Sequence, residues 1–499
     1  MHVCDWTGEA PSPFPLRLVL SAALAVGALH GTAAVFGQAA DPLDSSKVLK
    51  LKTFATHSSA SLHESAIDLT HPKDGSGRIF VSTNEGRIHA FSSSGTSLGS
   101  FLDFNTAAVP DFNKTLGFTT NGLSYIAFHP DYSKAGAPGD GKVYTLYTSL
   151  IPGVREPDYT GARLATRPGD VISQYVVVEW AVDATNPNRI DTTSRREVIR
   201  FEFSGPGETV HSVGEISFNP FSVPGQDDYG NLYLALGDAF AGGAVKNWQH
   251  VQDSDNPFGK LLRINPLQNG SDPYSVPADN PFHDDGSLLD KDDNVEEIFA
   301  WGLRYPQNFS FAKDPRGEHR LIVFDIGASD FEELNIVDLG DNHGWSHRDG
   351  PIKGNKNTTL NLPEGSTLES PATVYDHNIP NLPGATPIKG PGAITGGFVV
   401  ADPGDPDFQN QVVFGDLARG AFFHADFSAL LAADAANTQA PMRVLKVSLD
   451  GGPAGNFRDL IGEDRGDARF GVDERGRLFV ISRQTNAIYL TDLIADQKP

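Results

Sequence analysis

The stretch "NPFSVPGQDDYGNLYLALGD" (219–238) joins a turn rich in Pro, Gly, Asp and Asn to a short apolar strand. The same order of turn and strand recurs in five more stretches, at 71–82, 129–148, 312–327, 401–416 and 472–482. Further β-like runs, such as "SQYVVVEWAVD" (173–183), lie between the copies. Between residues 60 and 490 no long segment has the 3.6-residue periodicity of an amphipathic helix.

Six copies of a multi-strand unit, with no helices to cover the sheet faces, predict an all-β fold: a six-bladed β-propeller with four-stranded blades. A small twisted sheet cannot bury both faces alone, so neighbouring blades must cover them. A pair of β-sandwich domains is the alternative, but no linker-like stretch divides residues 50–490. In a propeller, polar loop residues from several blades can converge near the central channel.

Charge and cysteine content restrict the possible functions. The net charge of −24 opposes binding to phosphate backbones, so we expect no nucleic-acid partner. An acidic, oxygen-rich surface is compatible with neutral sugars and with calcium. The single cysteine, Cys4, excludes disulfides within the chain and zinc sites built on several cysteines.

Near the N-terminus, Arg17 precedes the apolar run "LVLSAALAVGALHGTAAVFGQAADP". This pattern is typical of a secretory signal, although an uncleaved membrane anchor is the alternative. We therefore expect a signal peptide at 1–40, an N-terminal segment at 41–59 and the propeller at 60–495. The expected location is secreted or periplasmic, with no stable membrane insertion after cleavage.

Three stretches stand out from the repeat: His211 with the strand that ends in Gly237 and Asp238, "EEIFAWGLRYPQNFSF" (296–311) and "FDIGASDFEELNIVDLGDNHGW" (324–345). Together with "GKLLRINP" (259–266), "AITGGFVV" (393–400) and "VVFGDLARG" (412–420), they resemble the soluble PQQ-dependent glucose/sorbosone (aldose sugar) dehydrogenases. The phrases occur in the family's order over about 60–490. The resemblance also implies a six-bladed propeller.

The resemblance implies that His211 is the base that takes the proton of the anomeric hydroxyl, because histidine titrates near working pH. Hydride would pass to pyrroloquinoline quinone (PQQ), and Arg304 would stabilise negative charge on the cofactor. Calcium would be held by the carbonyls of Gly327 and Ala328 and by the Glu332 side chain. The expected partners are a small sugar substrate and an external electron acceptor.

Several positions depart from the family phrases. Thr120 stands where a glutamine is usual, and Ala418 stands where a lysine holds a cofactor carboxylate. Tyr305 follows the matched arginine in place of asparagine. We expect Tyr305, Arg419 and Arg469 to contact the cofactor, with the arginines substituting for the missing lysine.

Each assignment has a plainer alternative. His211 could be a loop histidine that bonds to backbone, Arg304 could pair with a carboxylate between blades, and the turn at 325–333 could be a solvated acidic loop. At the level of function, the alternatives to a quinoprotein are a non-redox propeller that binds a carbohydrate or a protein, or a calcium-dependent lactonase.

Overall fold

The computed structural model describes residues 47–56, 65–107, 109–113, 122–149, 155–160, 170–206, 211–239, 249–283, 294–353, 367–376, 392–401 and 406–491. The predicted signal peptide and Thr120 lie outside these ranges. Among the helices that are described, none has the length and apolar content that a bilayer crossing requires.

Four sheets stand alone, each formed by strands that follow one another along the chain. The first contains β2 (Ala66–Thr70), β3 (Ile79–Thr83), β4 (Arg87–Phe91) and β5 (Ser97–Asp103). The second contains β6 (Leu123–Phe128), β7 (Lys142–Ser149), β9 (Asp170–Asp183), β10 (Asn186–Pro206) and the short β8 (Tyr159–Thr160). The third contains β11 (Val213–Phe218), β12 (Leu232–Leu236), β13 (Lys260–Ile264) and β14 (Ile298–Trp301). The fourth contains β15 (Pro306–Lys313), β16 (His319–Asp325), β17 (Phe331–Val337) and β20 (Thr373–Asp376).

The other long strands form one eight-stranded sheet. Its order is β21 (Ile394–Val399), β22 (Gln411–Asp416), β23 (Phe422–Asp426), β24 (Met442–Leu449), β1 (Val48–Thr56), β27 (Ala487–Thr491), β26 (Leu478–Ser482) and β25 (Ala468–Val472). β1 runs parallel to β24 and antiparallel to β27, so pairing extends this sheet N-terminally of residue 60. A two-stranded ribbon, β18 (Arg348–Asp349) with β19 (Ile352–Lys353), and the short helices α1 (Gln249–Gln252), α2 (Phe427–Ala435) and α3 (Phe457–Ile461) complete the elements of the described residues.

The repeated sequence pattern corresponds to one recurring position in these sheets. Its six copies end in β3, β7, β12, β16, β22 and β26. Each of these strands pairs antiparallel with the strand before it, namely β2, β6, β11, β15, β21 and β25. All five residues of β3, β12 and β26 are buried, as apolar strands covered on both faces should be.

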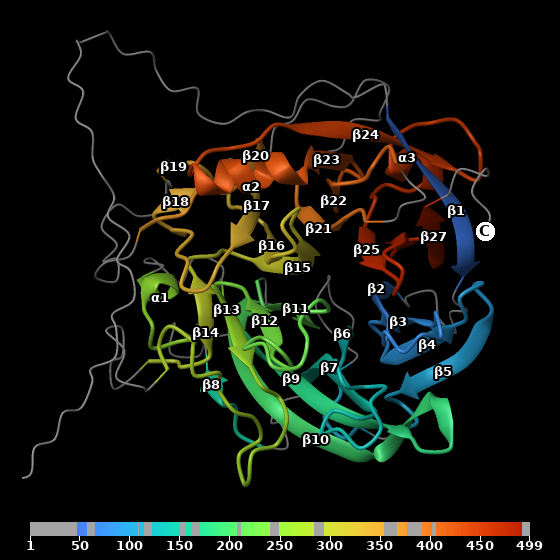
Figure 1. Cartoon of the computed structure of the whole chain (residues 1–499), viewed down its shortest axis with the longest axis vertical. Coiled ribbons are helices and arrows are strands. Elements are labelled where there is room, and N and C mark those ends of the chain that lie inside the picture. The colour runs from blue at the N-terminus through green and yellow to red at the C-terminus, as the bar shows by residue number, and fades with distance from the viewer. Residues whose placement is uncertain are drawn as a thin grey trace, which may run out of the picture. The chain divides into compact units, whose positions relative to one another are not determined.

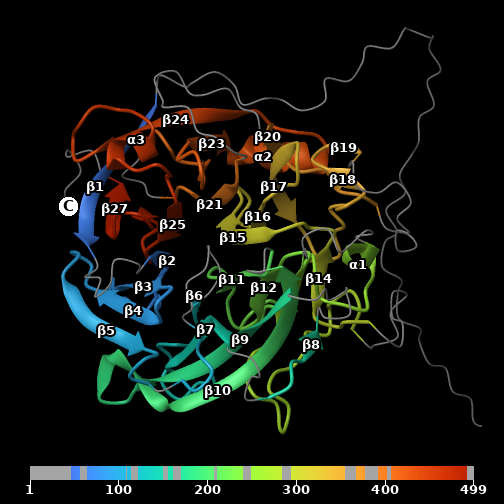
Figure 2. The ribbon, with the colours of Figure 1, turned by 180° about the vertical axis from the view of Figure 1, so that it is seen from behind.

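Within the compact unit of residues 36–499, the first strands of the six repeats contact one another in a closed cycle: β2 with β6, β6 with β11, β11 with β15, β15 with β21, β21 with β25, and β25 with β2. Figures 1 and 2 show these strands on the inner side of the sheets, toward the middle of the ring. Side chains on the inner strands of different sheets can therefore approach one another.

The hydrophobic core is divided into clusters that lie between adjacent sheets. One cluster joins the second and third sheets through Tyr144, Phe203, Leu234 and Leu262, all fully buried. Burying a large apolar side chain stabilises the fold by about 1.5–3 kcal/mol. Each sheet is thus held mainly by its neighbours.

The structure confirms the all-β class and a propeller-like arrangement. It does not show six separate four-stranded blades. Four sheets stand alone, because β1 joins the last two groups of strands into a single eight-stranded sheet.

Candidate active site

His211 lies just before β11, at the inner edge of the third sheet. Its backbone φ is 63°, in the left-handed region that non-glycine residues seldom adopt. The turn is tight, since a Cβ atom at Gly237 would lie 2.4 Å from the His211 carbonyl oxygen. Such a backbone conformation persists only where the surroundings enforce it, and it is common at functional sites.

Asp238 orients the His211 ring. Its Oδ1 lies 2.7 Å from Nδ1 of His211, and its Oδ2 accepts a 2.8 Å hydrogen bond from Nε1 of Trp345. The Asp238 carbonyl accepts from Nε2 of His250 at 2.9 Å. Both members of the His211–Asp238 pair are buried. Because a carboxylate accepts the Nδ1 proton, we assign His211 the tautomer in which Nε2 is the basic nitrogen.

The two partners shift each other's titration. Burial and then the Arg304 charge hold the pKa of His211 below its ordinary value, against the opposing effect of Asp238. Burial alone raises the pKa of Asp238, but the charges of His211, Arg304 and His250 bring it below the ordinary value. At neutral pH the pair is therefore a neutral imidazole beside a carboxylate.

Arg304 follows β14 and is fixed through its backbone and its side chain. Its N–H donates to Oδ2 of Asp325 at 2.9 Å, and its carbonyl accepts from the N–H of Asp238 at 2.8 Å. Its Nη1 donates to the carbonyls of Ile326 and Gly327, at 2.8 and 2.6 Å. The guanidinium carbon lies 5.7 Å from the ring centroid of Trp345. The side chain of Trp345 thus contacts Arg304 and Asp238, the partner of His211.

Tyr305 forms one wall of the site. Its ring stacks on that of His211 at a centroid distance of 5.1 Å and an interplanar angle of 20°. Its N–H donates to Oδ1 of buried Asp325 at 2.6 Å. Burial raises the pKa of Asp325 to about 7, although the N–H groups of Arg304 and Tyr305 oppose the shift.

Arg469, on β25, is another arginine among the inner strands. Its Nη1 donates to Oε1 of Gln307 at 2.8 Å, to Oδ1 of Asn308 at 3.1 Å and to Oγ1 of Thr395 at 3.0 Å. Within the described residues, no carboxylate lies at ion-pair distance from this guanidinium, and its buried Nε has no hydrogen-bond partner. Neutral acceptors position the side chain and leave its charge available to an anion.

Two half-buried carboxylates, Asp68 and Glu215, are among the ionisable groups that interact with Arg469. Asp68 on β2 accepts from the N–H of Ile126 on β6, and Glu215 on β11 accepts from the N–H of Phe309 on β15. Burial raises the pKa of Asp68 to about 7, and burial and the Asp68 charge raise that of Glu215 to about 8. Arg469 opposes both shifts.

Two of the three predicted calcium ligands accept hydrogen bonds within the protein. The Gly327 carbonyl accepts from Arg304, and Oε2 of Glu332 accepts from the N–H groups of Gly327 and Ile394, at 3.3 and 2.9 Å. Ala328 turns its N–H toward Oδ1 of Asp349. The described residues also contain no group of three His, Cys, Asp or Glu side chains placed to hold a metal. Two of the three predicted ligands are backbone carbonyls, which such a group would not include, so the calcium ligand set stays a prediction.

Arg419 lies in the turn between β22 and β23, where its N–H donates to Oδ1 of Asp416 at 2.6 Å. Ala418, the position that lacks the family's lysine, is buried in the same turn. The recorded contacts join His211, Arg304 and Tyr305 to one another, and Arg469 lies against the two residues that follow Pro306. Arg419 is instead hydrogen-bonded to Asp416 through its backbone N–H.

Sequence reasoning missed the supporting residues of the site. Asp238 was visible as the end of the repeated strand, and its position after Gly237 was the available signal. Trp345, Gln307 and Asn308 lie in the singled-out stretches, but their roles could not be predicted because they depend on contacts between distant sheets.

Residues 63–448 match the family model described as Glucose / Sorbosone dehydrogenase. Among curated proteins, the chain is 27% identical to the HIPL1 protein of Arabidopsis thaliana over 379 residues, which cover 70% of this chain and 50% of that protein. It is 24% identical to the Hedgehog-interacting protein of Homo sapiens over 415 residues, which cover 83% of this chain and 48% of that protein. The chain spans about half the length of the curated relatives it matches.

Among solved structures, the soluble aldose sugar dehydrogenase of Escherichia coli, in its apo form, aligns with a TM-score of 0.52. The alignment covers 88% of this chain and 97% of that one, at 17% identity. At this identity the likeness supports the fold alone.

Proposed function

The chain belongs to the glucose/sorbosone dehydrogenase family, and on that premise we propose that it oxidises the anomeric carbon of an aldose or related sugar. In the proposed reaction, the C–H bond at that carbon breaks with its electron pair leaving as hydride, the hydroxyl proton passes to His211, and a C=O bond forms. The product is a lactone, and the two electrons leave finally to an external acceptor.

The observation that carries this proposal is the His211–Asp238 pair beside Arg304. Nε2 of His211 is the base, because Asp238 holds the Nδ1 proton and the lowered pKa keeps the ring neutral at pH 7. After His211 accepts a proton, the buried Asp238 carboxylate stabilises the imidazolium. The Arg304 guanidinium stabilises negative charge that develops next to the substrate.

PQQ, when bound, would supply the carbon centre that accepts the hydride. The residues present fit this group in one respect: it carries carboxylates, and the hydrogen bonds that the described residues offer to the Arg469 cation come from neutral acceptors. Arg469 would bind a carboxylate, with Arg419 as a second cation, and the Tyr305 ring would lie against the cofactor beside His211. The predicted calcium ligands are the carbonyls of Gly327 and Ala328 and the Glu332 side chain, and none of the steps above depends on the ion.

We also propose how many blades the propeller has and where in the cell the protein is located. In this reading the eight-stranded sheet is two four-stranded blades, β21–β24 and β25–β27 with β1, which gives six blades. Secretion or export to the periplasm remains our proposal from the N-terminal sequence.

The proposal is tested by dye-linked oxidation of a sugar panel, with purified protein reconstituted with PQQ and calcium. We expect turnover that disappears without PQQ and falls strongly in His211→Gln. A PQQ absorbance change and a rise in melting temperature should accompany reconstitution. Absence of turnover together with an unchanged spectrum and melting temperature would exclude the redox function.

A second candidate is a propeller that binds a protein partner without redox chemistry. Ala418 in place of the lysine supports it, as does the similarity to a relative named Hedgehog-interacting protein. Under this alternative, PQQ leaves the melting temperature unchanged while a protein ligand raises it.

A further inference from the structure

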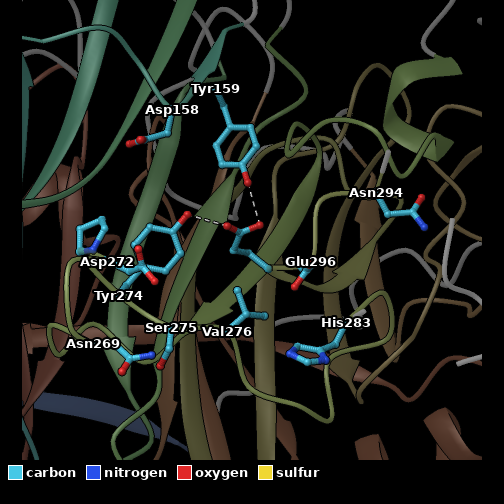
Figure 3. A pocket seen from close by; sticks show the side chains of 12 residues that line it. Asp158, Tyr159, Asn269, Asp272, Tyr274, Ser275, Val276, His283, Asn294 and Glu296 are labelled. Carbon is cyan, nitrogen blue, oxygen red and sulfur yellow. Dashed lines mark hydrogen bonds between the residues drawn. The ribbon is translucent and has the colours of Figure 1, made fainter. Parts of the chain in front are cut away.

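A cavity of about 650 Å³ lies away from the His211 site, between the second and third sheets. Its lining includes Tyr159 of β8, Tyr274 of the hairpin that follows β13, His283, and the pair Glu296 and Glu297 before β14. The hydroxyls of Tyr159 and Tyr274 both donate to the Glu297 carboxylate, and Figure 3 shows the two tyrosine side chains in this wall. None of the residues proposed for sugar oxidation lines this cavity.

Glu297 is a buried anion with no cationic partner. It is 5% exposed, and its two carboxylate oxygens accept from the hydroxyls of Tyr159 and Tyr274, at 2.8 and 2.6 Å. Burial and then the Glu297 charge raise the pKa of both tyrosines, so each stays a neutral donor. In the part of the chain that the structure describes, no Lys or Arg lies within ion-pair distance of Glu297. A carboxylate in this environment attracts a cation more strongly than one in water.

The rest of the lining also favours a ligand that donates hydrogen bonds. Asp158, Asp272 and Glu296 add carboxylates to the wall, and no Lys or Arg is among the described residues that line it. His283 presents a buried Nδ1 with no hydrogen-bond partner among the described residues, which is an unused acceptor in the Nε2–H tautomer. Three kinds of acceptor, namely carboxylate, phenol oxygen and imidazole nitrogen, therefore surround one volume.

The walls are rigid and the cavity is large. The Tyr159 ring stacks on Phe201 at 5.9 Å and 16°, and both tyrosines pack against the core between the sheets. Arg196 holds the hairpin by donating to the carbonyls of Pro273 and Pro266, each at 2.6 Å. A volume of this size fits an organic molecule rather than a bare ion, and aromatic faces attract alkylammonium groups.

We propose that this cavity binds an organic ammonium group, with Glu297 as its counter-ion and the two tyrosines as the positioning residues of that carboxylate. A free polyamine and the lysine side chain of a partner protein share this chemistry. The site is independent of sugar oxidation, so its test needs no turnover.

The test is calorimetric titration in 150 mM salt, which suppresses attraction to the acidic surface in general. The matched probes are 1,6-diaminohexane and 1,6-hexanediol, which differ in their terminal groups, with Mg²⁺ as the metal probe. We expect saturable binding of the diamine and none of the diol. Glu297→Gln should weaken diamine binding at least tenfold, while Asp191→Asn, at an exposed site on β10, should leave it unchanged.

If Glu297→Gln does not fold, the double variant Asp272→Asn/Glu296→Gln changes the wall without touching the buried carboxylate, and it should weaken diamine binding about threefold to tenfold. Spermidine and Nα-acetyl-lysinamide then distinguish the two sources, and tighter binding of either one supports the site. Equal binding of diol and diamine, full competition by Mg²⁺, or unchanged affinity in the folded carboxylate variants would each overturn the proposal.

Discussion

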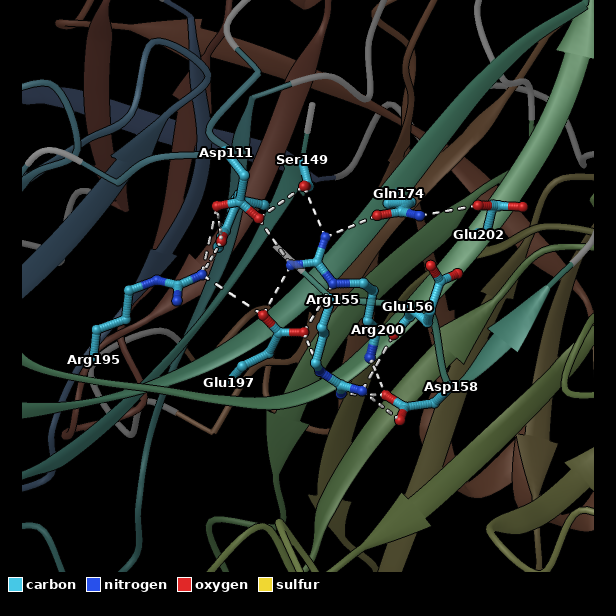
Figure 4. A network of polar contacts seen from close by, with 11 residues as sticks. Asp111, Ser149, Arg155, Glu156, Asp158, Gln174, Arg195, Glu197, Arg200 and Glu202 are labelled. Carbon is cyan, nitrogen blue, oxygen red and sulfur yellow. Dashed lines mark hydrogen bonds and ion pairs between the residues drawn. The ribbon is translucent and has the colours of Figure 1, made fainter. Parts of the chain in front are cut away.

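Arg200 and Arg469 are both buried arginines on strands, yet their surroundings differ. On β10, Arg200 is fully buried, and each of its five N–H groups donates: to Glu197 twice, and to Asp111, Ser149 and Gln174 once each. Figure 4 shows this network. On β25, Arg469 donates to neutral acceptors, and among the described residues its Nε has no partner.

The difference separates a structural cation from one available to a ligand. Two carboxylates neutralise Arg200 within the protein, so no ligand is needed to compensate its charge. Arg469 is held in place without being neutralised. The raised pKa values of Asp68 and Glu215 favour their neutral forms, so these nearby acids do not fully neutralise it. Burial alone therefore does not identify a functional arginine, whereas the chemistry of its acceptors does.

The largest effect should come from Arg200→Met. Removing one partner of a buried ion pair leaves Asp111 and Glu197 in low-dielectric surroundings, so the free energy of unfolding should fall by about 3–5 kcal/mol. Denaturant unfolding measures the change. The control is Arg189→Met, which removes an exposed pair with Asp183 and should cost about 0–1 kcal/mol. Equal losses of unfolding free energy in both variants would show that Arg200 is no more important to stability than an exposed arginine.

On the Arg469 side of the comparison, His211→Gln should reduce kcat for sugar oxidation by about 100-fold or more, because the general base is lost. The melting temperature should change little. His319→Gln, at the start of β16, is the control and should retain full activity. A loss of activity that simply follows a loss of stability would show a structural role for His211.

Arg469→Gln sharpens the contrast directly. Loss of one charge-assisted contact should weaken PQQ binding about 10- to 100-fold, with a stability change within about 1 kcal/mol. Fluorescence titration with PQQ measures the affinity. Arg465→Gln removes a half-exposed arginine paired with Asp467 and should leave PQQ affinity unchanged. A large stability loss in Arg469→Gln would show that Arg469, like Arg200, is a structural cation.

The smallest effect concerns pH. Since the pKa of Glu215 is raised from 4.5 to about 8, the folded protein holds a proton that the unfolded chain releases. Its stabilising contribution is complete below pH 4.5 and is lost as pH rises through 8. Glu215→Gln should therefore gain stability relative to the parent as the pH rises from 5.5 to 8.5. A difference that is flat with pH, or of opposite sign, would show that Glu215 is ionised throughout.

The sequence predicted the fold class because one strand position repeats with the same turn chemistry, in β3, β7, β12, β16, β22 and β26. It did not predict that β1 joins two groups of strands, because parallel pairing between residues about 400 positions apart leaves no local pattern. His211 and Arg304 were accessible as members of ordered phrases. The neutral partners of Arg469, and the meeting of Tyr159 with Glu297, depend on the folded arrangement of separate sheets.

The position of β1 between β24 and β27 has a consequence for how the protein is made. On the ribosome, Val48–Thr56 emerges long before either of its partner strands, and its edges stay unpaired while most of the polypeptide is translated. The ring can close only after Ala487–Thr491 has left the exit tunnel. Closure of the ring therefore waits until the whole of residues 48–491 has been synthesised, and an exposed strand edge must be shielded from aggregation until then.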